Sequence, residues 1–154
     1  MLLSVLVLLH LVGFAAFVGG ALAQQHFMRS SGRAGLVSAV RDEYERLAAS
    51  VCTKVELTGL FAQVLTGVAI IAALPGFLTQ HWLHAKLTAV VVLLVLAHVE
   101  MINARRIVKA RQAGGEGAEG DITARKKRHA TVGLVVDVLI VAVLLLASVL
   151  RTGF

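Results

Sequence analysis

Four ionisable side chains stand inside long apolar stretches of the sequence, where a charge is costly. His10 lies in the first stretch, and the third contains His84, Lys86 and His98. Ionisable groups at membrane depth commonly line a pathway or hold a ligand or cofactor. Imidazole is a common axial ligand of haem, and a helical bundle can hold a porphyrin between facing histidines. The sequence therefore predicts a cofactor site, with His10 and His84 as the facing pair and Lys86 as the partner of a tetrapyrrole carboxylate.

A second set of ionisable groups is expected at one level near the other side of the bundle. Glu56 enters its helix about as far as Asp137 enters the last one, and His98 lies at a similar height on the third. Three such groups from three helices could pair and neutralise one another. We predict a buried polar layer of Glu56, His98 and Asp137, with His98 also a candidate cofactor residue.

Two further histidines stand at the edges of apolar blocks. His81 and His129 are expected to be wetted helix ends, although His81 and His84 are three residues apart and could share a metal ion on one helical face. Copper sites usually add thioether or thiolate ligands. Cys52 is the single cysteine, and the methionines fall away from this pair. Metal binding by His81 and His84 is therefore a further hypothesis.

Four apolar blocks must position these side chains, at about residues 2–23, 51–74, 82–102 and 130–150. Each is close to the roughly 20 residues that cross a hydrocarbon core as a helix. The chain is only 16% charged, whereas a soluble domain is about a quarter charged. The apolar–polar alternation of membrane strands is absent. The predicted fold is all-α, a single four-helix transmembrane domain over residues 1–154.

Basic residues lie mainly just outside the apolar blocks, in segments 24–50 and 103–129, while the short connection "ALPGFLTQH" has no Lys or Arg. The positive-inside rule predicts that both basic segments are cytoplasmic loops of a bacterial-type plasma membrane protein, with both termini outside. The formal charge of +6 is then expected to meet anionic lipid headgroups rather than nucleic acid.

Local patterns refine the connections. Apolar residues at near-helical spacing from Leu36 to Leu47 predict an amphipathic extension of the second helix. Four glycines in "RQAGGEGAEGD" predict a flexible loop, and Pro75–Gly76 is expected to end the second helix.

The first block has a rival interpretation as a signal peptide, because "GGALAQQ" resembles a cleavage site. The start "MLLSVLVLLH" has no basic residue, and cleavage would place the basic segments outside. We therefore expect this helix to be retained. Ala15, Gly19 and Ala23 recur every four residues on it and predict a helix-packing face.

Two motifs resemble a known family. "LHLVGFAAFVGG", which contains His10, and "WLHAKLTAVVVLLVLAH", which contains Lys86, are similar to the first and third helices of small membrane proteins related to the HemJ-type protoporphyrinogen oxidase. That group is similar in turn to the CopD copper-resistance membrane proteins. The resemblance implies a four-helix bundle, haem b or another tetrapyrrole as cofactor, and site roles for His10 and Lys86.

The sequence departs from that family in two places. The family's aromatic tail after the first helix is replaced by "ALAQQHFMRSS", and its Asn-Glu-x-Pro element before the last helix is replaced by "RKKRHATVGLVVD". Two expectations follow: a diverged relative that binds haem, or one that keeps the scaffold alone.

Three functions follow as hypotheses. The first is an inner-membrane protein that binds haem b or a related tetrapyrrole and acts in redox or tetrapyrrole chemistry, as an oxidoreductase of HemJ type if it is an enzyme. The second is a non-catalytic accessory subunit, in a homo-oligomer or a larger membrane complex. The third is CopD-like copper transport. Motifs of soluble enzymes, such as G-x-S-x-G or H-E-x-x-H, are absent from the sequence.

Overall fold

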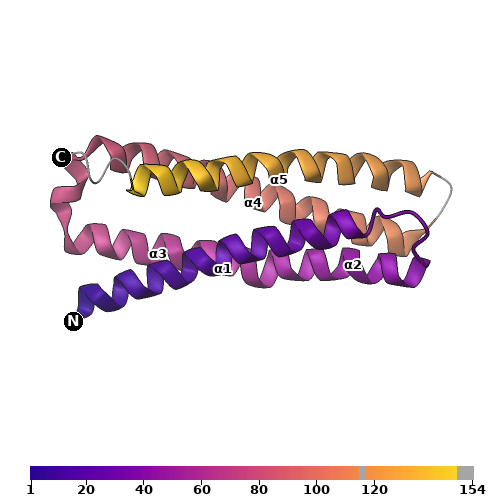
Figure 1. Ribbon diagram of the computed structural model, residues 1–154, viewed down its shortest axis with the longest axis horizontal. Helices are drawn as coiled ribbons and strands as arrows, with labels where there is room; N and C mark the ends of the chain where they lie inside the picture. Colours follow the sequence, from indigo (N-terminus) through magenta and orange to yellow (C-terminus); the bar gives the residue numbers. More distant parts are fainter. Residues whose placement is uncertain (115–116, 149–154) are drawn as a thin grey trace.

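Long helices account for nearly all of the chain. The computed structural model describes residues 1–114 and 117–148, and these form an elongated helical bundle (Figure 1). Its elements, in chain order, are α1 (Leu2–Ser30), α2 (Ser38–Val51), the π-helical η1 (Cys52–Glu56), α3 (Leu57–Ala73), the 3-10 helical η2 (Pro75–Thr79), α4 (His81–Ala113) and α5 (Ala118–Ser148). Because α2, η1 and α3 follow without a break, they make one rod.

Four helical rods of the described chain are long and apolar enough to cross a membrane: Leu2–Ser30, Ser38–Ala73, His81–Ala113 and Ala118–Ser148. Large apolar side chains cover much of their outer surface, and Leu65, for example, is 70% exposed. In water such a surface would be costly, but lipid tails are as apolar as these side chains. The predicted all-α fold with four candidate membrane spans is confirmed.

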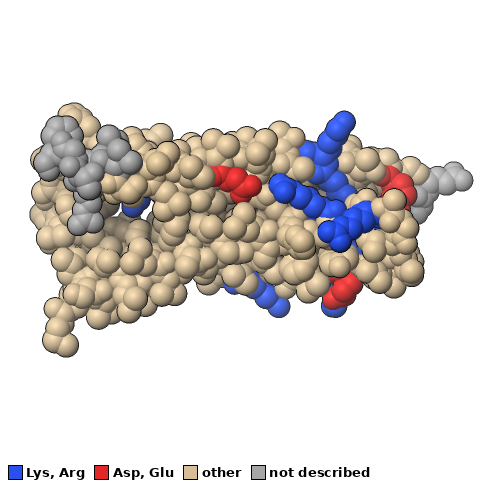
Figure 2. All heavy atoms as spheres, viewed as in Figure 1, with Lys and Arg blue, Asp and Glu red and all other residues tan. Residues whose placement is uncertain are grey.

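The two ends of the bundle differ in charge. We call the end with the α1–α2 connection and the α4–α5 connection the basic end, and the end with Met1 and η2 the η2 end (Figure 1). Lys and Arg side chains gather toward the basic end in the face shown in Figure 2. The charge asymmetry predicted from the sequence is therefore a property of the folded bundle.

The helices extend further at the basic end than predicted. The segments expected as loops, 24–50 and 103–129, are largely helical, and most of "RQAGGEGAEGD" belongs to α4 and α5. Between these helices Gly114 and Gly117 have φ angles of +60° and +90°, which glycine adopts without strain. The predicted loop is therefore shorter than expected and is confined to residues 114–117, of which 115 and 116 lie outside the described residues. The amphipathic extension over α2 and the helix end before Pro75 are confirmed.

A buried acidic group explains why these helical extensions pack together. Glu45 of α2 is 1% exposed. Its carboxylate accepts hydrogen bonds from Arg111 of α4, at 3.0 and 3.1 Å, and lies 2.6 Å from Nζ of Lys126 on α5. A buried charge is tolerated when it is paired and hydrogen-bonded. The three extensions therefore meet around Glu45.

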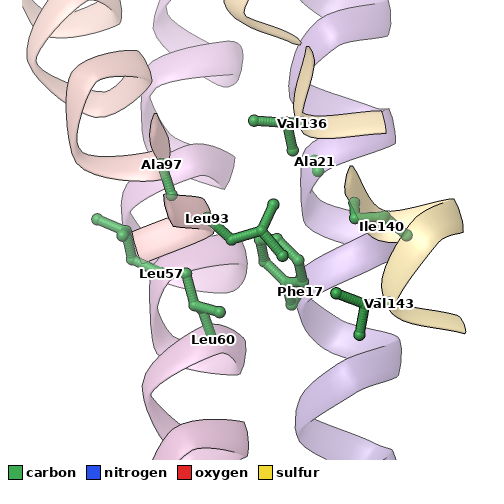
Figure 3. Packing of buried hydrophobic residues seen from close by; sticks show 9 residues of the cluster. All are labelled: Phe17, Ala21, Leu57, Leu60, Leu93, Ala97, Val136, Ile140 and Val143. Carbon is green, nitrogen blue, oxygen red and sulfur yellow. The ribbon is translucent and has the colours of Figure 1, made fainter. Parts of the chain in front are cut away.

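An apolar layer fills the middle of the bundle. Its members come from all four rods and are Phe17, Ala21, Leu57, Leu60, Leu93, Ala97, Val136, Ile140 and Val143 (Figure 3). Phe17 is 1% exposed and lies among side chains from the other helices. This apolar layer separates the polar side chains near one end from those near the other.

Helices α1 and α3 approach closely at glycines. A Cβ on Gly59 would lie 2.5 Å from the backbone nitrogen of Phe17, and a Cβ on Gly20 would lie 2.7 Å from that of Glu56. The small-residue face predicted from Ala15, Gly19 and Ala23 was wrong for contacts within the chain. Ala15 and Gly19 are exposed, and a Cβ on Gly19 would meet nothing within 4 Å.

Candidate functional site

A cavity of about 300 Å³ opens between α1, α3 and α4 toward the η2 end. Both His10 and Lys86 line it, together with Gln63 and Gly67 of α3 and a largely apolar remainder. Figure 2 shows a hollow near this end with a basic side chain inside it. Two of the residues predicted to form a cofactor site are thus brought to one cavity.

The imidazole of His10 is oriented by α3. Its Nδ1 lies 2.9 Å from the carbonyl oxygen of Gln63 and 3.2 Å from the hydroxyl of Thr66. The Gln63 carbonyl can only accept, and the Thr66 hydroxyl already donates to the carbonyl of Ala62 at 2.7 Å. Both neighbours are therefore hydrogen-bond acceptors toward Nδ1, so Nδ1 carries the proton. The lone pair of Nε2 is left for another partner.

A glycine makes room for this ring. A Cβ on Gly67 would lie 3.2 Å from Cε1 of His10, closer than most carbon contacts in proteins. Gln63 and Gly67 are four residues apart, so they share one face of α3. Gly67 makes room for the histidine of α1, and the carbonyl of Gln63, which also accepts a hydrogen bond from the Thr66 hydroxyl, orients it.

Lys86 enters the cavity without an acidic neighbour. No Asp or Glu is among the described residues that line the cavity. The ammonium group is part-buried beside apolar side chains such as Leu83 and Val90. A part-buried cation of this kind favours an anionic partner, and a carboxylate is the simplest one.

Aromatic residues stand where the cavity approaches the η2 end. Phe77 of η2 and Trp82 of α4 both line it, and their rings meet edge to face with centroids 6.2 Å apart. Trp is enriched at membrane interfaces, because its ring has both an apolar body and a polar N–H group. An aromatic pair of this kind is typical of the interfacial ends of membrane helices.

The other histidines predicted for the site lie elsewhere. His84 is exposed, donates from Nε2 to the carbonyl of Leu78 at 2.8 Å, and is not among the residues that line the cavity. The expected facing pair of His10 and His84 is therefore not formed. His81 is also exposed, and within residues 1–114 and 117–148 no group of three or more His, Cys, Asp or Glu side chains could hold a metal ion.

A second polar site, the buried polar cluster, lies between the apolar layer and the basic end. Its members are Gln24, Gln25, Glu56, Glu100, His129 and Asp137. Gln24, Glu56 and Glu100 are completely buried, at 0% exposure. Gln24 accepts a hydrogen bond from Nε2 of His129 at 2.7 Å and donates one to Glu100 at 3.1 Å. Nε2 of His129 lies 4.0 Å from the same Glu100 oxygen.

Asp137 belongs to a separate branch of the cluster. Gln25 donates to Oδ1 of Asp137 at 3.1 Å and to the carbonyl of Gly133 at 3.2 Å. The amide oxygen of Gln25 accepts a hydrogen bond from Arg29 at 3.1 Å. Arg29 therefore acts on Asp137 through a neutral amide rather than by direct contact.

His98, which we expected in this layer, lies apart from these hydrogen bonds. Its Nδ1 donates to the carbonyl of Leu94 on its own helix at 2.9 Å, and its ring meets Phe61 edge to face at 5.9 Å. The expectation that His129 is a wetted helix end was wrong, since this residue is 2% exposed.

Sequence reasoning missed the role of Gln24, Glu100 and His129. Two of them carried a usable signal. Gln24 shares a stripe of α1 with His10 and Phe17, and Glu100 follows Lys86 by 14 residues, which is two heptads of α4.

No protein-family model matches the chain, and neither a curated protein nor a solved structure is significantly similar to it.

Proposed function

We propose that the chain is a plasma-membrane protein that binds haem b or a related tetrapyrrole in the cavity between α1, α3 and α4, and acts in redox or tetrapyrrole chemistry. One observation carries the proposal: the unpartnered Nε2 of His10 on a ring whose Nδ1 is fixed 2.9 Å from the carbonyl of Gln63. Ligating histidines commonly donate their other N–H to a carbonyl or carboxylate, which sets the tautomer and the ring orientation.

The surroundings of His10 fit such a group. The cavity is mainly apolar, as a macrocycle requires, and Lys86 supplies a cation for a carboxylate at its edge. His10 is the single histidine among the described lining residues, so the chain would contribute one imidazole to a haem iron. A haem bound there would supply reversible one-electron chemistry.

We further propose that the basic end is cytoplasmic. Basic residues such as Arg105, Arg106 and Lys109 lie on the part of α4 nearest that end, and cytoplasmic segments of membrane proteins carry an excess of Lys and Arg. Anionic headgroups of the inner leaflet would then meet them. This orientation puts the cavity in the outer half of the membrane.

An absorption spectrum of the full chain, purified in mild detergent, tests the cofactor. We expect a Soret band in the oxidised protein and α and β bands after dithionite reduction. His10→Ala should remove the pigment while the protein stays helical and monodisperse. The matched control is His84→Ala, which changes an exposed histidine outside the cavity and should leave the pigment in place. A colourless wild-type protein, or unchanged pigment in His10→Ala, would contradict the proposal.

The accessory-subunit hypothesis is the second candidate. Ala15 and Gly19 form a small-residue surface on α1 that no other helix of the described chain covers. Such surfaces allow close approach of another membrane helix. Isolation of a colourless protein together with a stable membrane partner would favour this function. We do not propose copper transport, because His81 and His84 have no third ligand nearby in the described residues.

A further inference from the structure

The buried polar cluster contains two carboxyl groups with unmet hydrogen-bonding capacity. Apart from the weak thiol donor of Cys52, neither carboxyl oxygen of Glu56 has a hydrogen-bond partner, and Oε2 of Glu100 has none either. Both residues are 0% exposed. Nδ1 of His129, which is almost as deeply buried, is unpartnered as well. Buried polar groups are normally satisfied, so these atoms indicate an exchangeable partner.

The charged groups around the pair do not neutralise it. Asp137 of α5 adds a third carboxyl within electrostatic range, and the Cys52 thiol of η1 adds only a weak donor. From α1 the cluster receives neutral amides, and Arg29 is bonded to one of them, Gln25, rather than to a carboxyl group. Arg105 of α4 is exposed. An ionised carboxylate in an apolar interior without a cation is very costly, whereas a protonated carboxyl group is not.

We propose that Glu56 and Glu100 form a proton-binding site inside the bundle that exchanges protons with the basic end through His129. The ligand is a proton rather than a metal ion, because the described residues bring no three His, Cys, Asp or Glu ligands together. This inference goes beyond the proposed function, which needs only the cavity at the η2 end.

His129 connects the pair to the basic end. It lines a cavity of about 160 Å³, together with Arg29, Gly32 and Lys126, close to the α1–α2 connection. On the other side, its Nε2 is 4.0 Å from Oε1 of Glu100, a gap that a small side-chain rotation closes. Gln24 bonds to both residues and is a positioning residue for this step.

Proton transfer through His129 takes place in two steps. A proton from the basic end binds the lone pair of Nδ1 on neutral His129, and the proton on Nε2 moves to the Glu100 carboxylate. Glu100 becomes a neutral carboxylic acid, and His129 returns to the neutral form with its proton on Nδ1. The reverse transfer restores the starting tautomer: Glu100 returns a proton to Nε2, and Nδ1 then releases its proton to the basic end. A proton can then pass between Glu100 and Glu56 without adding a charge to the apolar interior.

The apolar layer closes the path toward the η2 end. On α1, Phe17 and Ala21 lie between His10 and Gln24, which are about 21 Å apart along the helix. The other three rods contribute the remaining seven side chains of the apolar layer (Figure 3). The proton site therefore opens toward one end, and the His10 cavity opens toward the other.

Infrared spectroscopy of the full chain in detergent tests the site directly. At neutral pH we expect the carbonyl stretch of a protonated carboxyl group, shifted by transfer to D₂O, and largely lost in the double variant Glu56→Gln, Glu100→Gln. The control is Glu43→Gln, an exposed residue paired with Arg46, which should keep the band. Absence of the band from the wild-type protein, or full intensity in the double variant, would overturn the proposal.

The rate at which this band exchanges after a jump into D₂O tests the path. His129→Gln keeps a hydrogen-bonding side chain but cannot relay a proton, and should slow exchange by at least about tenfold. His98→Gln, on a histidine bonded to its own helix, should not. Equal rates in His129→Gln and wild type would overturn the relay. Both measurements are independent of pigment, so failure of the tetrapyrrole proposal would not affect them.

Discussion

Nδ1 of His10 lies 2.9 Å from the backbone carbonyl oxygen of Gln63, and this contact joins α1 to α3 at the candidate cofactor site. A backbone acceptor cannot rotate away, so it specifies the ring tautomer more firmly than a side chain would. The same face of α3 provides Gly67, whose missing side chain leaves space for the ring. The free Nε2 is therefore a consequence of the packing of α1 on α3.

Replacement of Gly67 by valine should displace His10 and remove the bound pigment. Even a single Cβ would lie 3.2 Å from Cε1 of His10, and the two branches of valine would demand more movement. We expect pigment content to fall as far as in His10→Ala, measured by the Soret absorbance per protein. Gly19→Ala is the control, because a Cβ there meets nothing within 4 Å. Full pigment in Gly67→Val would show that the position of His10 does not matter.

Lys86 should determine which tetrapyrroles bind. We expect Lys86→Met to weaken binding of a dicarboxylate porphyrin by about tenfold or more, since a charge-assisted contact to a carboxylate contributes roughly 1.5–3 kcal/mol. Binding of the matching dimethyl ester should change little, and Lys86→Arg should retain most of the affinity for the acid. Titration of the purified protein by absorbance measures both ligands. Equal losses for acid and ester would mean that Lys86 acts by shape rather than by charge.

The sequence predicted the four spans well, because about 20 consecutive apolar residues permit few other structures. It predicted less well which residues of each helix face the bundle interior. On α4 we expected His84 in the cofactor site and His98 in the buried polar layer, but Lys86 lines the cavity and Glu100 belongs to the buried polar cluster. Both pairs have heptad spacing, so spacing alone could not choose between them. The sequence did contain one signal. The next heptad position after His98 is Arg105, a charged residue that favours an exposed face, and it is exposed in the structure.

Other features depended on contacts that no local pattern encodes. Helix α5 begins at Ala118, within a glycine-rich segment, and this helical extension packs where Lys126 reaches Glu45 on a distant part of the chain. The burial of His129 likewise depends on Gln24, which lies 105 residues earlier in the chain. The polar residues around the start of α5 and around His129 predicted exposure to solvent. Contacts with distant parts of the chain bury them instead.

Removal of the Glu45 carboxylate should destabilise the basic end. Glu45→Gln leaves Arg111 and Lys126 without their shared anion, and both cations are largely buried, with side chains 15% and 18% exposed. We expect the free energy of unfolding in detergent to fall by about 1–3 kcal/mol. Glu43→Gln removes only an exposed pair with Arg46 and should cost less than about 0.5 kcal/mol. Equal stability of the two variants would contradict a role for Glu45 in joining the helices.

The glycine contacts between α1 and α3 should be sensitive to a single methyl group. Gly59→Ala would place Cβ 2.5 Å from the backbone nitrogen of Phe17, so the helices must separate. Overpacking of this kind costs about 1–3 kcal/mol, and thermal unfolding in detergent should register it. Gly19→Ala replaces an exposed glycine on the same α1 and should be neutral or slightly stabilising. A stable Gly59→Ala protein would mean that the two helices pack less closely than described.

Membrane orientation can be tested with single cysteines, because Cys52 is the one natural cysteine and it is buried. In a Cys52→Ala background, Ala34→Cys places a thiol in the exposed α1–α2 connection at the basic end, and Gln80→Cys places one beside η2. If the basic end is cytoplasmic, a membrane-impermeant maleimide added to intact cells should label Gln80→Cys and not Ala34→Cys. Both should react once the membrane is opened, which controls for accessibility. Labelling of Ala34→Cys alone in intact cells would reverse the orientation, and would place the His10 cavity in the cytoplasmic half of the membrane.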